Sequence, residues 1–229
     1  MRIILGILLG FLFAVGIAAA AAYVAFGGLT DVGERDKSKD VSQSFDLSGY
    51  DRIEAAGVFE LNVTVGGDFA LEVSGTPEAM ERLSATVENG ELVLDQKRGP
   101  RGVKGWRDSL TATVSLPSLR AIDISGVVDG KATGIAAEAF TADLSGVGDL
   151  VLTGTCDNLN LDVSGVGDLD ASGLKCKTVD VDVSGIGDAK VYASEAVDAT
   201  VNGIGSITVE GSPSRVEKTN NFIASITVR

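Results

Sequence analysis

The second half of the chain repeats one short phrase at nearly constant spacing, which restricts the folds available to it. The copies are DISGVVDG (123–130), DLSGVGDL (143–150), DVSGVGDL (162–169), DVSGIGDA (182–189), VNGIGSIT (201–208) and NFIASITV (221–228). When they are aligned on Ser125, Ser145, Ser164, Ser184, Asn202 and Asn221, the steps are 20, 19, 20, 18 and 19 residues. This period is too short for a pair of helices and is typical of one coil of a β-solenoid.

Apolar residues recur at fixed distances from the aligned Ser or Asn, which we call the anchor. Positions one, three and five before the anchor are apolar in nearly every copy, and this period of two indicates one face of a β-strand. Two more aliphatic columns lie two and seven residues after the anchor, and we expect all five columns to point inward. The column two after the anchor is Val127, Val147, Val166, Ile186 and Ile204.

Glycines occupy the sharp corner that joins the two expected strand segments of each coil. The corner reads Ser-Gly-Val-Gly-Asp, and glycine is expected there because a sharp corner often needs a positive φ. Parallel crossover connections are almost always right-handed. The sequence therefore predicts an all-β fold, a right-handed parallel β-helix or β-solenoid with coils of about 19–20 residues, preceded by an N-terminal hydrophobic helix.

The N-terminus is a candidate targeting or anchoring segment. Arg2 is the only charge before residue 30, and the apolar run 3–26 is long enough to span a bilayer. The alanine run at 18–22 can also supply a signal-peptide cleavage site. We predict that 1–29 is a signal peptide or a transmembrane anchor, with the anchor slightly favoured, and that 30–40 is a polar tether. Both alternatives place the remaining chain in the periplasm or at the cell surface.

Residues 41–116 have a less regular sequence pattern than the repeats. Segments 45–53, 59–65, 69–74 and 91–95 are strand-like, Asn89-Gly90 is a hairpin turn signal, and 77–83 can form a short helix. The phrase EAAGVFELNV (54–63) echoes the repeat. We predict one β-solenoid domain over 41–229, in which 41–116 is an irregular capping region and 117–229 forms regular coils. A separate β domain over 41–116 is the alternative.

Three features together resemble a known family. They are the recurrent [DN]-x-S-G-[VI]-G coils, the opening phrase from Phe45 to Ile53, and the phrase GSPSRVEK (211–218). Over about 45–228 the chain resembles the "putative auto-transporter adhesin, head GIN domain" family. The resemblance implies a bacterial, exported, β-helical protein, and it supplies no catalytic residues.

The composition excludes several kinds of chemistry. The chain has no histidine, which excludes histidine bases, histidine metal ligands and Ser-His-Asp triads. Its 32 acidic and 19 basic residues give a net charge of −13, which disfavours nucleic acid as a partner. Gly-x-Gly recurs as Gly146/Gly148, Gly165/Gly167 and Gly185/Gly187, and because it repeats we interpret it as a structural corner. We assign no catalytic, cofactor-binding or metal-binding residue.

Carboxylates form two columns in the repeat: Asp123, Asp143, Asp162 and Asp182, and then Asp129, Asp149, Asp168 and Asp188. Stacked like charges should raise some of their pKa values, and Ca²⁺ would relieve the repulsion. The alternative that we favour is that the corner carboxylates accept hydrogen bonds from backbone N–H groups. The basic stretch 97–107 is either a contact for anionic polymers or headgroups, or a solvated loop.

Cys156 and Cys176 are the only cysteines, and each lies eight residues before an anchor serine. The repeat therefore places them at equivalent positions on adjacent coils. A rung spacing of about 4.8 Å lies within the Cα–Cα range that a disulfide accepts. Export would supply the oxidising compartment. We predict a Cys156–Cys176 disulfide.

The functional hypothesis from the sequence is a non-enzymatic, exported envelope protein with a structural or adhesive, ligand-binding role. Its expected partner is a polymer or protein of the envelope or cell surface, and the membrane itself if 3–26 is retained. Two alternatives stay open: a Ca²⁺-binding β-roll module and, less favoured, a polysaccharide-active β-helix enzyme.

Overall fold

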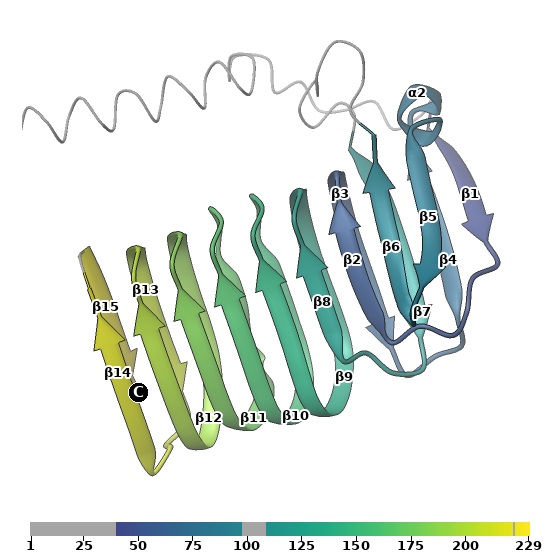
Figure 1. Cartoon of the computed structure of the whole chain (residues 1–229). Helices are drawn as coiled ribbons and strands as arrows, with labels where there is room; N and C mark the ends of the chain where they lie inside the picture. The colour runs from purple at the N-terminus through teal and green to yellow at the C-terminus, as the bar shows by residue number, and fades with distance from the viewer. Residues whose placement is uncertain (1–39, 98–108, 222) are drawn as a thin grey trace, which may run out of the picture.

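The computed structural model describes residues 40–97, 109–221 and 223–229, and it shows a single stack of β coils (Figure 1). The strands are β1 (Val41–Phe45), β2 (Arg52–Ala56), β3 (Val58–Val65), β4 (Ala70–Gly75), β5 (Leu83–Glu88), β6 (Glu91–Gln96), β7 (Leu110–Leu116), β8 (Ala121–Ile124), β9 (Val127–Leu144), β10 (Leu150–Val163), β11 (Leu169–Val183), β12 (Ile186–Val201), β13 (Ile204–Glu210), β14 (Arg215–Asn220) and β15 (Ile223–Val228). The short helix α2 (Pro77–Met80) lies between β4 and β5, with Thr76 as its N-cap. The predicted β-solenoid is confirmed.

Each coil contributes strand segments to two faces of the stack. The first face runs β5, β6, β2, β8, then the later parts of β9 to β12, and ends at β14. The second face runs β1, β4, β7, β3, then the early parts of β9 to β12, and ends at β13 and β15. β6 and β7 pair antiparallel with β5 and β4 on one side. On their other side, every described strand pair along the stack is parallel, so equivalent repeat positions lie directly on one another, as Leu161 does on Val181.

The core consists of aliphatic ladders. The column one residue before the anchor is fully buried in every coil, with Ile124, Leu144, Val163, Val183 and Val201 at 0% exposure. The columns three and five before the anchor and seven after it are also buried, as predicted.

The column two after the anchor does not point inward, and that prediction was wrong. Val147, Val166, Ile186 and Ile204 are 37%, 48%, 52% and 46% exposed. The buried column seven after the anchor lies five residues further along the chain. Because side chains alternate along a strand, two columns an odd number of residues apart cannot both face the core.

The coils are not stacked in chain order at the N-terminal end. β2 and β3, which carry the echo of the repeat, lie between the β6–β7 rung and the β8–β9 coil. The Asn89-Gly90 hairpin turn is confirmed, with φ of 52° and 80°, and it joins β5 to β6. The expected strand over 45–53 was wrong, because β1 ends at Phe45 and Gly49 adopts a left-handed φ of 80° before β2 begins.

Some predicted segments lie outside the described residues. These are 1–29, assigned to the signal peptide or transmembrane anchor with its hydrophobic helix, 30–39 of the polar tether, and 98–107 of the basic stretch. Among the residues that the structure does describe, no helix is both long and apolar enough to cross a membrane.

Candidate functional site: the corner edge

The repeated corners stack into one continuous edge of the solenoid, which we call the corner edge (residues 145–149, 164–168, 184–188 and 202–206). Backbone hydrogen bonds join each corner to its neighbours. The N–H groups of Ser164 and Gly165 both donate to the carbonyl of Leu144, at 3.0 and 3.1 Å, and that of Val166 donates to Gly146 at 2.9 Å. The edge is therefore a regular backbone ladder whose side chains repeat once per coil.

The first glycine of the corner is required by close packing. A Cβ atom on Gly165 would lie 2.0 Å from the carbonyl oxygen of Gly146 in the preceding coil. The positive φ that we expected at Gly165 belongs instead to the second glycine of a corner, for example 138° at Gly148. The prediction that glycine is needed holds, but its reason at Gly165 is steric.

An exposed aliphatic ridge follows the corner edge. It consists of the outward column two after the anchor, continued on β15 by Ile223, which pairs with Ile204 and is 63% exposed. We define the ridge as Val147, Val166, Ile186, Ile204 and Ile223. Parallel bridges link Val147 to Val166 and Val166 to Ile186, so the side chains form one unbroken row.

One row of carboxylates borders the ridge and bonds to the backbone. The backbone N–H of Asp168 donates to Oδ1 of Asp149 at 3.0 Å, and that of Asp188 donates to Oδ1 of Asp168 at 2.9 Å. The row ends where both the N–H and the hydroxyl of Ser206 donate to Asp188, at 2.8 and 2.7 Å. The corner carboxylates therefore satisfy backbone donors, as we favoured, although each donor belongs to the next coil.

A second row of carboxylates borders the ridge on the first face, and the pKa values of some of its members are raised. Burial raises the pKa of Asp143, and the charges of Asp123 and Asp162 raise it further. Burial also raises the pKa of Asp182, with Asp162 and Asp180 adding to the shift. Within the described ranges, no three His, Cys, Asp or Glu residues form a group that could hold a metal ion.

A shallow depression of about 320 Å³ lies on the second face beside the corner edge. Its lining includes Glu60, Asp129, Lys131, Asp149 and Val151. The four charged side chains among them come from three different coils and have mixed sign. The depression extends the acidic margin of the edge toward β3.

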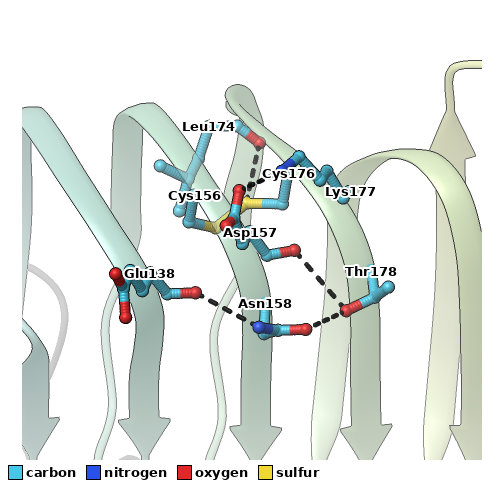
Figure 2. Close-up of a disulfide and its surroundings, with 8 residues drawn as sticks. All are labelled: Glu138, Cys156, Asp157, Asn158, Leu174, Cys176, Lys177 and Thr178. Atoms are coloured by element: carbon cyan, nitrogen blue, oxygen red, sulfur yellow. Dashed lines mark hydrogen bonds and ion pairs between the residues drawn. A yellow bond between two sulfur atoms is a disulfide. The ribbon is translucent and has the colours of Figure 1, made fainter.

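The two cysteines lie at the bend opposite the corner edge. Cys156 pairs with Cys176 in the parallel register, and a disulfide joins them with a Cα–Cα distance of 4.5 Å (Figure 2). A short polar chain continues across the neighbouring coils: Thr178 Oγ1 donates to Asn158 Oδ1 at 2.7 Å, and Asn158 Nδ2 donates to the Glu138 carbonyl at 3.3 Å.

Comparison with known proteins places this repeat architecture in a family. The model of the "putative auto-transporter adhesin, head GIN domain" family matches residues 49–213. The chain belongs to this family. A crystal structure described as a putative adhesin from Bacteroides fragilis is 23% identical, with a TM-score of 0.70, covering 86% of this chain and all of that one. Another described as a putative adhesin, from Parabacteroides distasonis, is 18% identical with a TM-score of 0.45, covering 83% of this chain and 97% of that one.

No curated protein matches the chain. The Bacteroides fragilis structure supports the fold of this adhesin-family chain. The ridge was missed as a surface feature by sequence reasoning because its Val/Ile composition resembles that of a core column. The odd spacing between the ridge and the buried column that follows it was the available signal.

An aspartate with a raised pKa and an aspartate with a lowered pKa should change the free energy of unfolding with opposite dependence on pH. The raised pKa of Asp143 means that the folded state holds this proton more tightly than the unfolded chain. Its stabilising contribution is therefore present below the ordinary aspartate pKa and is lost as pH rises through the raised value. Asp143→Asn should increase the free energy of unfolding at neutral pH and lose that advantage in acid, as measured by urea denaturation.

Asp170 is the matched control for this prediction. Burial opposes its ionisation, but hydrogen bonds from the Ser172 hydroxyl and N–H, at 2.6 and 3.0 Å, and the charge of Lys190 outweigh burial and lower its pKa. Asp170→Asn should therefore destabilise the protein at neutral pH, with the difference shrinking as pH falls. Effects of the same sign for both variants would contradict this account of the two sites.

We predict that the protein carries the Cys156–Cys176 disulfide in an oxidising compartment. Cross-linking residues 20 apart should stabilise the fold by about 3 kcal/mol in the chain-entropy model. Reduction, or the Cys156→Ser/Cys176→Ser double variant, should lower the free energy of unfolding by that order. Non-reducing peptide mapping should recover the linked peptides, and free thiols at both positions would contradict the prediction.

Proposed function

We propose that this chain is an exported, non-enzymatic envelope protein that uses the corner edge to bind a polymer or protein of the envelope or cell surface. The observation that carries the proposal is the aliphatic ridge. Contiguous exposed apolar side chains on a soluble surface commonly mark an interaction site. The ridge side chains are 37–63% exposed and form one row over successive coils.

The carboxylate rows on both sides of the ridge supply selectivity. They repel polyanions and favour a partner that presents positive charge beside apolar groups. Because the corners repeat once per coil, at about 4.8 Å, the surface suits an extended partner that contacts several rungs at once. Membership of a family named for adhesins supports the adhesive role.

Export by the segment 3–26 is part of the proposal. A retained segment would anchor the solenoid to the membrane, and cleavage would release it. N-terminal sequencing of the mature protein, together with its distribution between membrane and soluble fractions, distinguishes these two outcomes. A mature protein that never leaves the cytoplasm would refute the localisation.

The binding surface can be tested by a conservative triple variant, Val166→Thr/Ile186→Thr/Ile204→Thr. Threonine keeps the β-branched shape preferred in strands but makes the ridge polar. Pull-down from envelope fractions, followed by affinity measurement on the captured component, should show at least a tenfold loss. The matched control is Val41→Thr, which changes a 45% exposed valine on β1, at the opposite end of the stack from β13 and β15. Equal binding by the triple variant and the control would exclude the ridge as the contact surface.

A further inference from the structure

The two ends of the stack differ in how well their inward-facing side chains are covered. One end is formed by β1, β4 and β5 (Figure 1). There, partly buried side chains including Phe69, Met80 and Leu83 pack against the core. At the end formed by β14 and β15, the inward positions are only partly covered. Ile226 and Val228 are half-buried, and Val216 is 38% exposed. Each of these two strands also leaves one backbone edge without a described partner strand.

One charged side chain occupies the core column at this open end. Lys218 pairs with Ala199, which is fully buried, so the register directs Lys218 over the core. Its ammonium Nζ donates to the carbonyl of Ile226 at 3.3 Å. Because Lys218 lies on the first face and Ile226 on the second, the lysine stem crosses the open end from one face to the other.

Polar residues complete the closure. Asn220 pairs with the buried Val201, and the side-chain amide of Asn221 donates to Oδ1 of Asn202 at 2.7 Å. The last coil thus keeps the strand pairing of the repeat but replaces two aliphatic core positions by polar ones. Solenoids need terminal coils of this polar kind to stay soluble.

We propose that Lys218 closes the open end of the solenoid to a second copy of this chain. Without its charge, the end would present Val216, Ile226 and Val228 between two six-residue strand edges. Two copies could then pair β15 with β15 antiparallel, with Ile226 opposite Ile226 and the two cores joined. With Lys218 in place, that pairing would bury two ammonium groups without carboxylate partners, and inward charges of this kind block edge-to-edge pairing.

The proposal is independent of ligand binding at the corner edge. The family match ends at residue 213, so β14, β15 and Lys218 lie beyond the matched residues. The test below changes no ridge residue, so its failure would leave the proposed function untouched.

The experiment compares Lys218→Met with the wild-type full chain by sedimentation in mild detergent over a range of concentrations. Methionine keeps an unbranched stem over the core and removes the charge. We expect dimer formation with a dissociation constant at least tenfold lower than that of the wild type. Lys190→Met is the matched control, because it removes an equal charge from the outer surface of β12 and should stay monomeric.

A second variant keeps the test valid if Lys218→Met fails to fold. Lys218→Val places a strand-favouring aliphatic residue in the same column and should dimerise in the same way. Ser225→Cys together with Thr227→Cys, added to a Lys218 variant, should give a disulfide-linked dimer on a non-reducing gel if β15 pairs with β15, because this register places position 225 of one copy opposite position 227 of the other. A folded Lys218→Met or Lys218→Val chain that stays monomeric, or a wild-type chain that dimerises equally well, would overturn the proposal.

Discussion

Replacing Gly165 with valine should destabilise the protein by roughly 3 kcal/mol, the upper part of the range for overpacked sites. The Cβ of any residue at this position would meet the Gly146 carbonyl oxygen at 2.0 Å, which is impossible without moving the backbone. That carbonyl accepts the hydrogen bond from Val166, so the movement would also disturb the ladder between the two coils.

Ser164→Ala is the matched control because it changes the adjacent residue of the same corner. Ser164 joins the neighbouring coil through its backbone N–H, which alanine retains. The serine change should therefore cost less than about 0.5 kcal/mol. Urea denaturation of both variants measures the difference, and a larger loss for Ser164→Ala would show that the corner is not held by close packing at glycine.

The parts of the fold that the sequence predicted correctly depend on local alternation and on repetition. The buried column from Ile124 to Val201 follows from the period of two in each copy, and parallel stacking repeats that pattern on the next coil. The pairing of Cys156 with Cys176 follows from the same repetition. Neither required knowledge of how distant segments meet.

The parts that failed depend on backbone conformation and on long-range pairing. The odd spacing between the ridge and the next buried column indicates that the two columns face opposite sides. Which of them faces outward depends on the dihedral angles of the corner glycines, such as φ of 138° at Gly148. The position of β2 and β3 between β7 and β9 depends on contacts between distant segments, which the echo of the repeat alone could not order. The role that we propose for Lys218 was not predicted from the sequence because its coil matches the repeat weakly.

Removing one complete coil should leave a soluble β protein, whereas removing one residue fewer should not. Val181 pairs with Ala199, a step of 18 residues, so deletion of 181–198 joins Asp180 directly to Ala199. Ala199 then takes the place of Val181 beside Leu161, and Val201 takes the place of Val183 beside Val163. Both cysteines are retained, and Gly203 replaces Gly185 at the corner above Gly165.

Deletion of 181–197 is the matched control because it differs by a single residue. It joins Asp180, which points outward, to Asp198, and strand alternation would then direct the Asp198 carboxylate into the core. Burying an unpaired carboxylate costs several kcal/mol, and the alternative is a bulge that breaks the ladder. We expect the 18-residue deletion to give soluble protein with a strand-type circular dichroism spectrum and a cooperative melt. The 17-residue deletion should aggregate, and equal solubility of the two would mean that register between coils does not hold this solenoid together.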